Sequence, residues 1–166
     1  MARVEQADNS PELSSLTTGV NQPFNKINEL MTDLTISKLD YQRIRQRMEA
    51  IRATTKTPPT QLINLLRTIT GTNLVEPVQM PANIVTMNSL ITVDYIDSGK
   101  TLNLRLVYPE EANSATNRIS IFAPLASALL GRGQGELVQL PTPFGSVKVR
   151  INQVLYQPEA AGDFSL

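Results

Sequence analysis

The segment at residues 119–131 decides the fold, and it reads ISIFAPLASALLG. Its first residues are typical of a strand, and Pro124 then stands where the first residue of a helix is expected. The fixed φ of proline is already helical, and its missing N–H is one that a helix start leaves unpaired. Gly131 stands where the chain leaves a helix through a left-handed conformation. The segment therefore predicts a strand, a short helix over 124–130 and a glycine stop.

Alternating apolar side chains on the N-terminal side of this segment predict a β-hairpin. Residues 91–95 and 102–108 alternate apolar and polar side chains, which is typical of strands with one buried face. Between them, residues 97–100 read DSGK, a sequence that favours a tight turn.

A last strand is predicted on the C-terminal side, and its pattern contains one irregularity. Val149 and Ile151 continue a two-residue apolar period, but the apolar set then resumes at Val154, three residues on. This phase slip predicts a β-bulge near Asn152 and Gln153. Strands that close on one short helix indicate an α+β domain, which we assign to residues 83–166.

The chain before this domain divides into three parts. Residues 1–36 form a polar N-terminal extension, in which 23–31 favours a short helix and 34–36 a brief strand. Residues 37–72 are expected to form a short antiparallel helical hairpin of the coiled-coil type. Residues 73–82 contain two prolines that interrupt regular structure, so they are interpreted as a linker.

The hairpin is predicted from helix signals and apolar periodicity. Ser37 and Asp40 resemble a capping box at the start of the first helix, which ends near Arg52. The second helix starts near Pro59 and ends at Gly71. Apolar residues at helical spacing give each helix one buried face: Tyr41, Ile44, Met48 and Ile51 in the first, and Leu62, Leu65, Leu66 and Ile69 in the second. Each helix has only three to five turns, so the hairpin projects roughly 15 to 25 Å.

The composition excludes several classes of function. The 166 residues include no cysteine, histidine or tryptophan. Disulfides, thiolate zinc sites, a histidine base and a cysteine nucleophile are therefore absent, and we expect neither a cofactor nor a metal. No apolar run approaches the ~20 residues that span a bilayer. We expect a cytoplasmic monomer that makes no membrane contact.

Charge is unevenly distributed although the net charge is zero. Residues 38–67 contain seven basic and two acidic residues. Four arginines form a candidate basic face on the first hairpin helix: Arg43, Arg45, Arg47 and Arg52. Such a face suits an acidic partner surface or phosphates, but it is equally typical of a solvated helix whose arginine stems cover the apolar stripe. With 5% aromatic residues, the chain offers little for base stacking.

Several short sequences, in order along the chain, resemble one family. Besides 119–131 they are NIVTMNS at 83–89, GELV at 135–138, PFG at 143–145 and YQPEAAGDF at 156–164. Together they resemble the GreA/GreB superfamily of bacterial transcription factors, and within it the branch of Rnk, the regulator of nucleoside diphosphate kinase. The resemblance implies an FKBP-like C-terminal domain and binding to RNA polymerase at the rim of its secondary channel.

The same resemblance implies which residues dock on the polymerase. In the superfamily the segment matching Phe122, Ala123 and Pro124 contacts the channel rim, and we add Ser127 of the following helix to this candidate site. Ala123 replaces the serine of Gre factors, as it does in Rnk. The competing interpretation is that Pro124 only starts the helix and that Phe122 belongs to the core.

The hairpin tip departs from the Gre pattern. Gre factors hold a catalytic magnesium with acidic tip residues, and carboxylates suit this hard ion. Here the candidate tip residues are Thr54, Thr55, Lys56 and Thr57, with no carboxylate among them. This argues against stimulation of transcript cleavage, and the simplest alternative is a loop that only connects two helices.

We therefore expect a non-enzymatic transcription regulator that competes with Gre-type factors and regulates nucleoside diphosphate kinase. The expected partner contacts are RNA polymerase and an indirect contact with the transcription complex. One alternative function is a protein-binding module that acts directly on the kinase. The enzymatic alternative, a peptidyl-prolyl isomerase, is disfavoured because four Phe and four Tyr scattered along the chain hardly supply an aromatic pocket.

Overall fold

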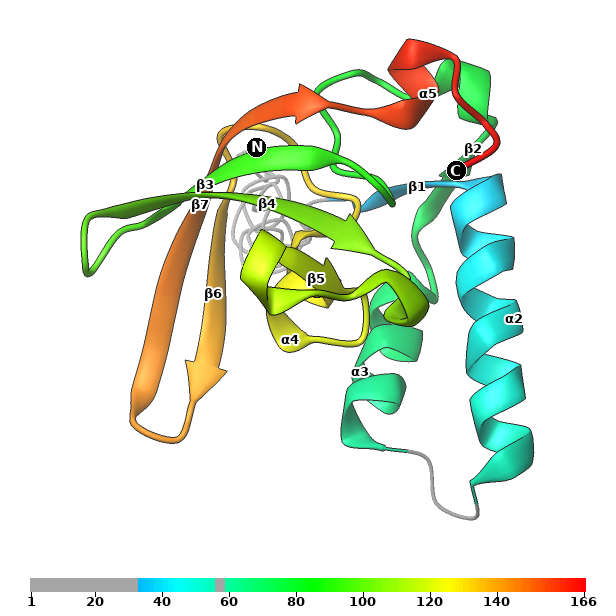
Figure 1. Cartoon of the computed structure of the whole chain (residues 1–166), viewed down its shortest axis with the longest axis horizontal. Coiled ribbons are helices and arrows are strands. Elements are labelled where there is room, and N and C mark those ends of the chain that lie inside the picture. The colour runs from blue at the N-terminus through cyan, green and yellow to red at the C-terminus, as the bar shows by residue number, and fades with distance from the viewer. Residues whose placement is uncertain (1–32, 56–58) are drawn as a thin grey trace, which may run out of the picture. The chain divides into compact units, whose positions relative to one another are not determined.

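A strongly curved five-stranded sheet wraps around one short helix, and two longer helices pack beside it (Figure 1). The computed structural model describes residues 33–55 and 59–166. The extension at 1–32, including the helix expected at 23–31, lies outside the described residues. Residues 33–166 form one compact unit.

The sheet is antiparallel except at one edge. Its strand order is β5-β4-β3-β7-β6, and only the β4–β5 pair is parallel. The strands are β3 (Leu90–Tyr95), β4 (Lys100–Val107), β5 (Arg118–Ser120), β6 (Leu137–Thr142) and β7 (Gly145–Tyr156). The predicted hairpin is confirmed as β3 and β4, which pair from Leu90 opposite Arg105 to Tyr95 opposite Lys100.

The predicted β-bulge is also confirmed. Thr92 pairs with Gln153 and the next residue, Val93, pairs with Ile151, which leaves Asn152 as the extra residue. A second register shift leaves Leu155 unpaired before the strand ends. The bulges let β7 bend, because an extra residue locally increases the twist of a strand.

Four helices and a small second sheet complete the described residues. The helices are α2 (Lys38–Thr54), α3 (Thr60–Ile69), α4 (Pro124–Leu129) and α5 (Pro158–Ala161), and single 3₁₀ turns lie at Pro77–Gln79, Pro109–Glu111 and Ser114–Thr116. β1 (Thr35–Ser37) pairs in parallel with β2 (Asn73–Val75). Residues 73–82, expected to be a linker, thus contain a strand and a 3₁₀ turn. In the part of the chain that the structure describes, no helix is long and apolar enough to cross a membrane.

The start of α2 corrects one prediction. The Ser37 hydroxyl accepts a hydrogen bond from the Asp40 N–H at 3.1 Å, so Ser37 is the N-cap as predicted. The Asp40 carboxylate does not complete a capping box. It is buried and accepts a hydrogen bond from the Met87 N–H at 3.0 Å, 47 residues away in sequence. A tertiary partner has replaced the local one.

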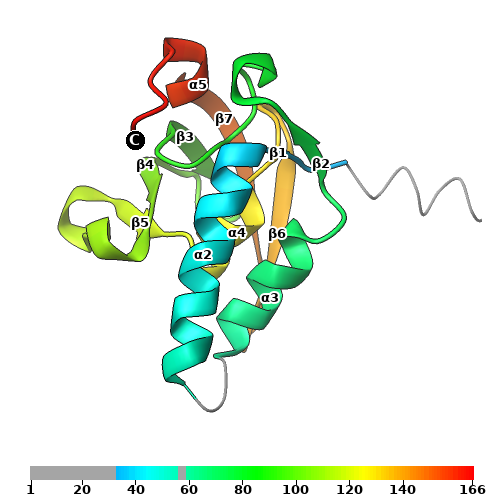
Figure 2. The ribbon, with the colours of Figure 1, turned by 90° about the vertical axis from the view of Figure 1, so that its right-hand side faces the viewer.

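The two hairpin helices lie side by side and share one core with the sheet (Figure 2). Ile44 and Met48 of α2 and Leu65 of α3 are buried in the same cluster as Ile91 of β3. The apolar stripes predicted from the sequence are therefore the surfaces that attach the hairpin to the sheet domain. A coiled coil and an FKBP-like arrangement stay predictions.

Candidate partner-docking site

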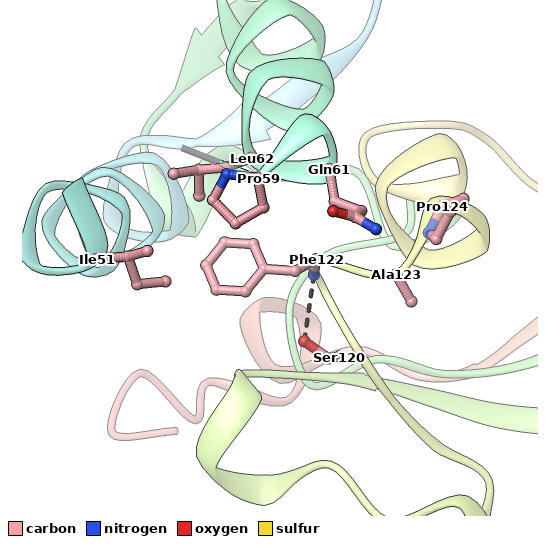
Figure 3. A pocket seen from close by; sticks show the side chains of 8 residues that line it. All are labelled: Ile51, Pro59, Gln61, Leu62, Ser120, Phe122, Ala123 and Pro124. Atoms are coloured by element: carbon pink, nitrogen blue, oxygen red, sulfur yellow. Dashed lines mark hydrogen bonds between the residues drawn. The ribbon is translucent and has the colours of Figure 1, made fainter. Parts of the chain in front are cut away.

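An apolar cleft of about 340 Å³ lies between the helical hairpin and the start of α4 (Figure 3). One wall comes from the ends of α2 and α3 that are nearest the hairpin tip, and the other from the segment that joins β5 to α4. The residues that line it are Ile51, Pro59, Gln61, Leu62, Ser120, Phe122, Ala123 and Pro124. Three of the four predicted docking residues therefore line one cleft.

The segment between β5 and α4 is held by its own hydrogen bonds. The Ser120 hydroxyl accepts from the Phe122 N–H at 3.2 Å, and the Ser120 carbonyl accepts from the Ala123 N–H at 2.8 Å. This turn aims the Phe122 ring at the hairpin, where it lies close to Ile51 and Pro59 (Figure 3). Phe122 is half-buried and packs against the core, so it both anchors the loop and lines the cleft.

Pro124 starts α4 as predicted and remains exposed. Ala123 is the N-cap residue, and its carbonyl accepts from the Ser127 N–H at 3.0 Å. Ser127 itself is buried, and its hydroxyl donates to the Pro124 carbonyl at 3.1 Å. Ser127 therefore stabilises the first turn of α4, whereas Pro124 offers a surface that a partner can touch.

The hairpin tip lies just beyond the cleft. Thr54 is the last residue of α2 and Thr55 follows it, and both are exposed. Lys56 and Thr57 lie outside the described residues. Because Ile51 already lines the cleft, α2 continues past it for only about one turn, or ~5 Å.

The arginines of the predicted basic face do not form a single surface. Arg43 donates to the backbone carbonyls of Phe164, at 3.0 Å, and Leu166. Arg47 stacks on the Tyr108 ring at 3.8 Å and pairs with Glu110 at 3.2 Å.

Arg45 and Arg52, in contrast, are exposed. Arg45 bonds to Tyr41 and Glu49 of its own helix, each at 3.3 Å. Only part of the expected basic face is therefore open to a partner, because Arg43 and Arg47 attach α2 to the rest of the chain.

The chemistry of the cleft suits binding of an apolar protein surface. None of the lining residues that the structure describes is ionisable, and the polar groups are the Gln61 amide and the Ser120 hydroxyl. The described residues contain no group of three or more acidic side chains that could hold a metal ion. Sequence reasoning missed five residues of the site, since the helix pattern marked Ile51 and Leu62 only as core: Ile51, Pro59, Gln61, Leu62 and Ser120.

Comparison with known proteins shows which family this chain is similar to. Residues 80–156 match the family model described as "Transcription elongation factor, GreA/GreB, C-term". The "Regulator of nucleoside diphosphate kinase" of Escherichia coli K12 is 35% identical over 91 residues, which are 54% of this chain and 67% of that protein. "Transcription elongation factor GreA" of Psychrobacter is 27% identical over 90 residues, 54% of this chain and 57% of that protein.

A solved structure extends the similarity beyond the C-terminal domain. The "Prokaryotic transcription elongation factor GreA/GreB from Nitrosomonas europaea" has a TM-score of 0.61 and 33% identity. The match covers 75% of this chain and 98% of that one. The chain thus shares its fold with a transcription elongation factor, and it belongs to the GreA/GreB family.

Proposed function

We propose that the protein is a non-enzymatic regulator that binds RNA polymerase at the secondary channel through the cleft beside Pro124. It competes there with Gre-type factors without stimulating transcript cleavage. The observation that carries the proposal is the cleft itself, because Phe122, Ala123 and Pro124, three of the four residues implied by the family resemblance, line one of its walls. A partner side chain that enters the cleft is removed from water on both sides, which is typical of the centre of a protein interface.

The short hairpin supports a role without cleavage. The α2 helix ends about one turn past the cleft, so the hairpin tip reaches only a short way beyond a partner bound in the cleft. The candidate tip residues also lack a carboxylate for magnesium. The regulator occupies the shared site and leaves the catalytic centre of the polymerase without the acidic residues of a Gre factor.

Regulation of nucleoside diphosphate kinase is the second part of the proposal. It is supported by the name of the Escherichia coli relative. We infer an indirect effect, through transcription, because the cleft is assigned to the polymerase. Direct binding to the kinase is the alternative, and the binding experiment below includes it.

The test is the affinity of the full chain for core RNA polymerase, measured by biolayer interferometry. Pro124→Glu places a charge in the cleft and should weaken binding at least about fivefold, since residues at the centre of an interface contribute more than about 1 kcal/mol. Pro143→Glu, at an exposed proline of the β6–β7 turn, is the matched control and should bind like the wild type. Equal affinities of wild type and a folded Pro124→Glu variant contradict the docking site. Binding to the kinase but not to the polymerase contradicts the proposed function.

A further inference from the structure

A buried carboxylate joins the start of α2 to the segment before β3. Asp40 is 4% exposed, and its carboxylate accepts the Met87 N–H at 3.0 Å. Because α2 leads to the hairpin tip and Met87 precedes the sheet, this bond fixes the base of the hairpin to the sheet domain. A buried carboxylate with so few partners is costly when charged, and nothing in the proposed docking site uses it.

A second carboxylate, from the C-terminal helix α5, holds the same segment. The Thr86 hydroxyl donates to Glu159 at 2.7 Å and lies 3.0 Å from the Ser89 hydroxyl. Asp40 and Glu159 thus bind neighbouring residues, Met87 and Thr86, from two different elements. The four residues 86–89 form a joint between α2, α5 and the sheet.

Two further charged groups, Arg43 and Asp163, line the same small cavity as Asp40 and Glu159. Arg43 lies one turn along α2, but its guanidinium is hydrogen-bonded to the carbonyls of Phe164 and Leu166. The Tyr108 hydroxyl is buried and has no hydrogen-bond partner among the described residues.

The electrostatics agree with this geometry. Burial, and then the negative charge of Glu159, raise the pKa of Asp40 to about 7, while the Met87 N–H, Arg43 and Ser37 act in the opposite direction. Burial and the charge of Asp40 likewise raise the pKa of the Tyr108 hydroxyl, so Tyr108 stays neutral. Asp40 therefore changes between its neutral and its charged form within the physiological pH range.

We propose that Asp40 and Glu159 form a proton-controlled latch that holds α5 and the C-terminal residues 162–166 against the base of α2. With a proton on Asp40, only Glu159 is charged and the latch is closed. When this proton leaves to water, two negative charges face each other in a buried joint, and their repulsion separates α5 from α2. Opening also frees Arg43, because its acceptors belong to the C-terminal residues.

The latch does not depend on polymerase binding and is tested on the free protein. The chain has no cysteine, so two exposed positions, Gln42 on α2 and Ala160 on α5, can be changed to cysteine and spin-labelled. Double electron–electron resonance should give one narrow distribution of distances between the two labels at about pH 5.5. At about pH 8.5 a second, longer distance should appear, with a midpoint near the Asp40 pKa of about 7. A wild-type distribution that is the same at both pH values overturns the proposal.

Two variants separate the latch from a general effect of pH. Asp40→Asn keeps an acceptor for Met87 and carries no charge, so its labels should stay at the short distance at both pH values. Glu110→Gln removes an exposed acid that contacts α2 outside the joint, and it should respond like the wild type. If Asp40→Asn does not fold, Glu159→Gln serves instead and should likewise abolish the opening. A folded Asp40 or Glu159 variant that opens as the wild type does overturns the latch.

Discussion

Arg47 of α2 stacks on Tyr108, with its guanidinium carbon 3.8 Å from the centre of the ring. The same guanidinium pairs with Glu110, so one side chain ties the middle of the hairpin to the segment that follows β4. Contacts hold α2 at three levels: the Asp40–Met87 hydrogen bond at its base, Arg47 in its middle and Phe122 near the tip. The hairpin therefore has a fixed direction relative to the sheet domain.

Removing the Arg47 contact should destabilise the fold. Arg47→Met keeps much of the apolar stem but loses the cation–π contact and the ion pair, so we expect a loss of about 1 kcal/mol in the free energy of unfolding. Urea denaturation followed by circular dichroism measures it. Arg45→Met removes an exposed arginine of the same helix and should cost less, because ion pairs between solvent-exposed side chains contribute little to stability. Equal losses would show that the Tyr108 contact contributes nothing.

Gly131 should not tolerate a side chain. Its φ is +79°, and a Cβ there would lie 3.1 Å from the Thr35 carbonyl oxygen and 3.3 Å from Ile36. Gly131→Ala should therefore lower the free energy of unfolding by roughly 2 kcal/mol or more, from backbone strain and from displacement of β1. Gly99→Ala is the matched control, because Gly99 also has a positive φ, +67°, but open space around it. If both variants lose the same stability, the contact with β1 is unimportant.

The raised pKa of Asp40 predicts that the free energy of unfolding falls as the pH rises. Its pKa is about 7 in the folded protein and near 3.8 when unfolded, so the folded state retains the proton over the range between them. The stabilising contribution is complete below the unfolded pKa and is lost as the pH rises through about 7. At about 1.4 kcal/mol per pKa unit, the loss amounts to a few kcal/mol.

The measurement is urea denaturation at several pH values with Asp40→Asn as the comparison. The neutral variant should lack this fall, and it should be more stable than the wild type at about pH 8. Parallel stability curves for the two proteins would contradict a raised Asp40 pKa.

Transcript cleavage should not be stimulated. In arrested elongation complexes, added protein should leave the rate of RNA cleavage at its intrinsic value, because the tip offers no carboxylate to magnesium. A Gre factor added with it should be inhibited, and Pro124→Glu should relieve this inhibition. Faster cleavage with the regulator alone would contradict the interpretation of the tip.

Salt dependence should distinguish the exposed arginines from the structural ones. If Arg45 and Arg52 face an acidic channel wall, the affinity for polymerase falls with salt, and Arg45→Gln with Arg52→Gln flattens this dependence. Arg43→Gln with Arg47→Gln should instead lower stability, since both side chains have partners within the chain. Equal salt slopes for the wild type and the Arg45/Arg52 variant would make the open part of the basic face a solvated surface.

Local signals in the sequence determined most of the secondary structure. Pro124 and Gly131 bound α4 because proline and glycine restrict or permit backbone angles wherever they stand. The apolar phase slip after Ile151 located the β7 bulge, because a strand that keeps one face buried must absorb the extra residue.

Only the tertiary structure decided how these elements combine. The cleft joins residues 51–62 to residues 120–124, and no local pattern states that two such segments meet. Asp40 looked like a helix cap because the residue three before it is a serine, yet burial turned its carboxylate to Met87 and brought it near Glu159. Arg43 and Arg47 looked like a charged surface until the fold supplied Phe164 and Tyr108 as partners. Sequence periodicity reports which face of an element is buried, whereas the partners of a polar side chain depend on segments that are distant along the chain.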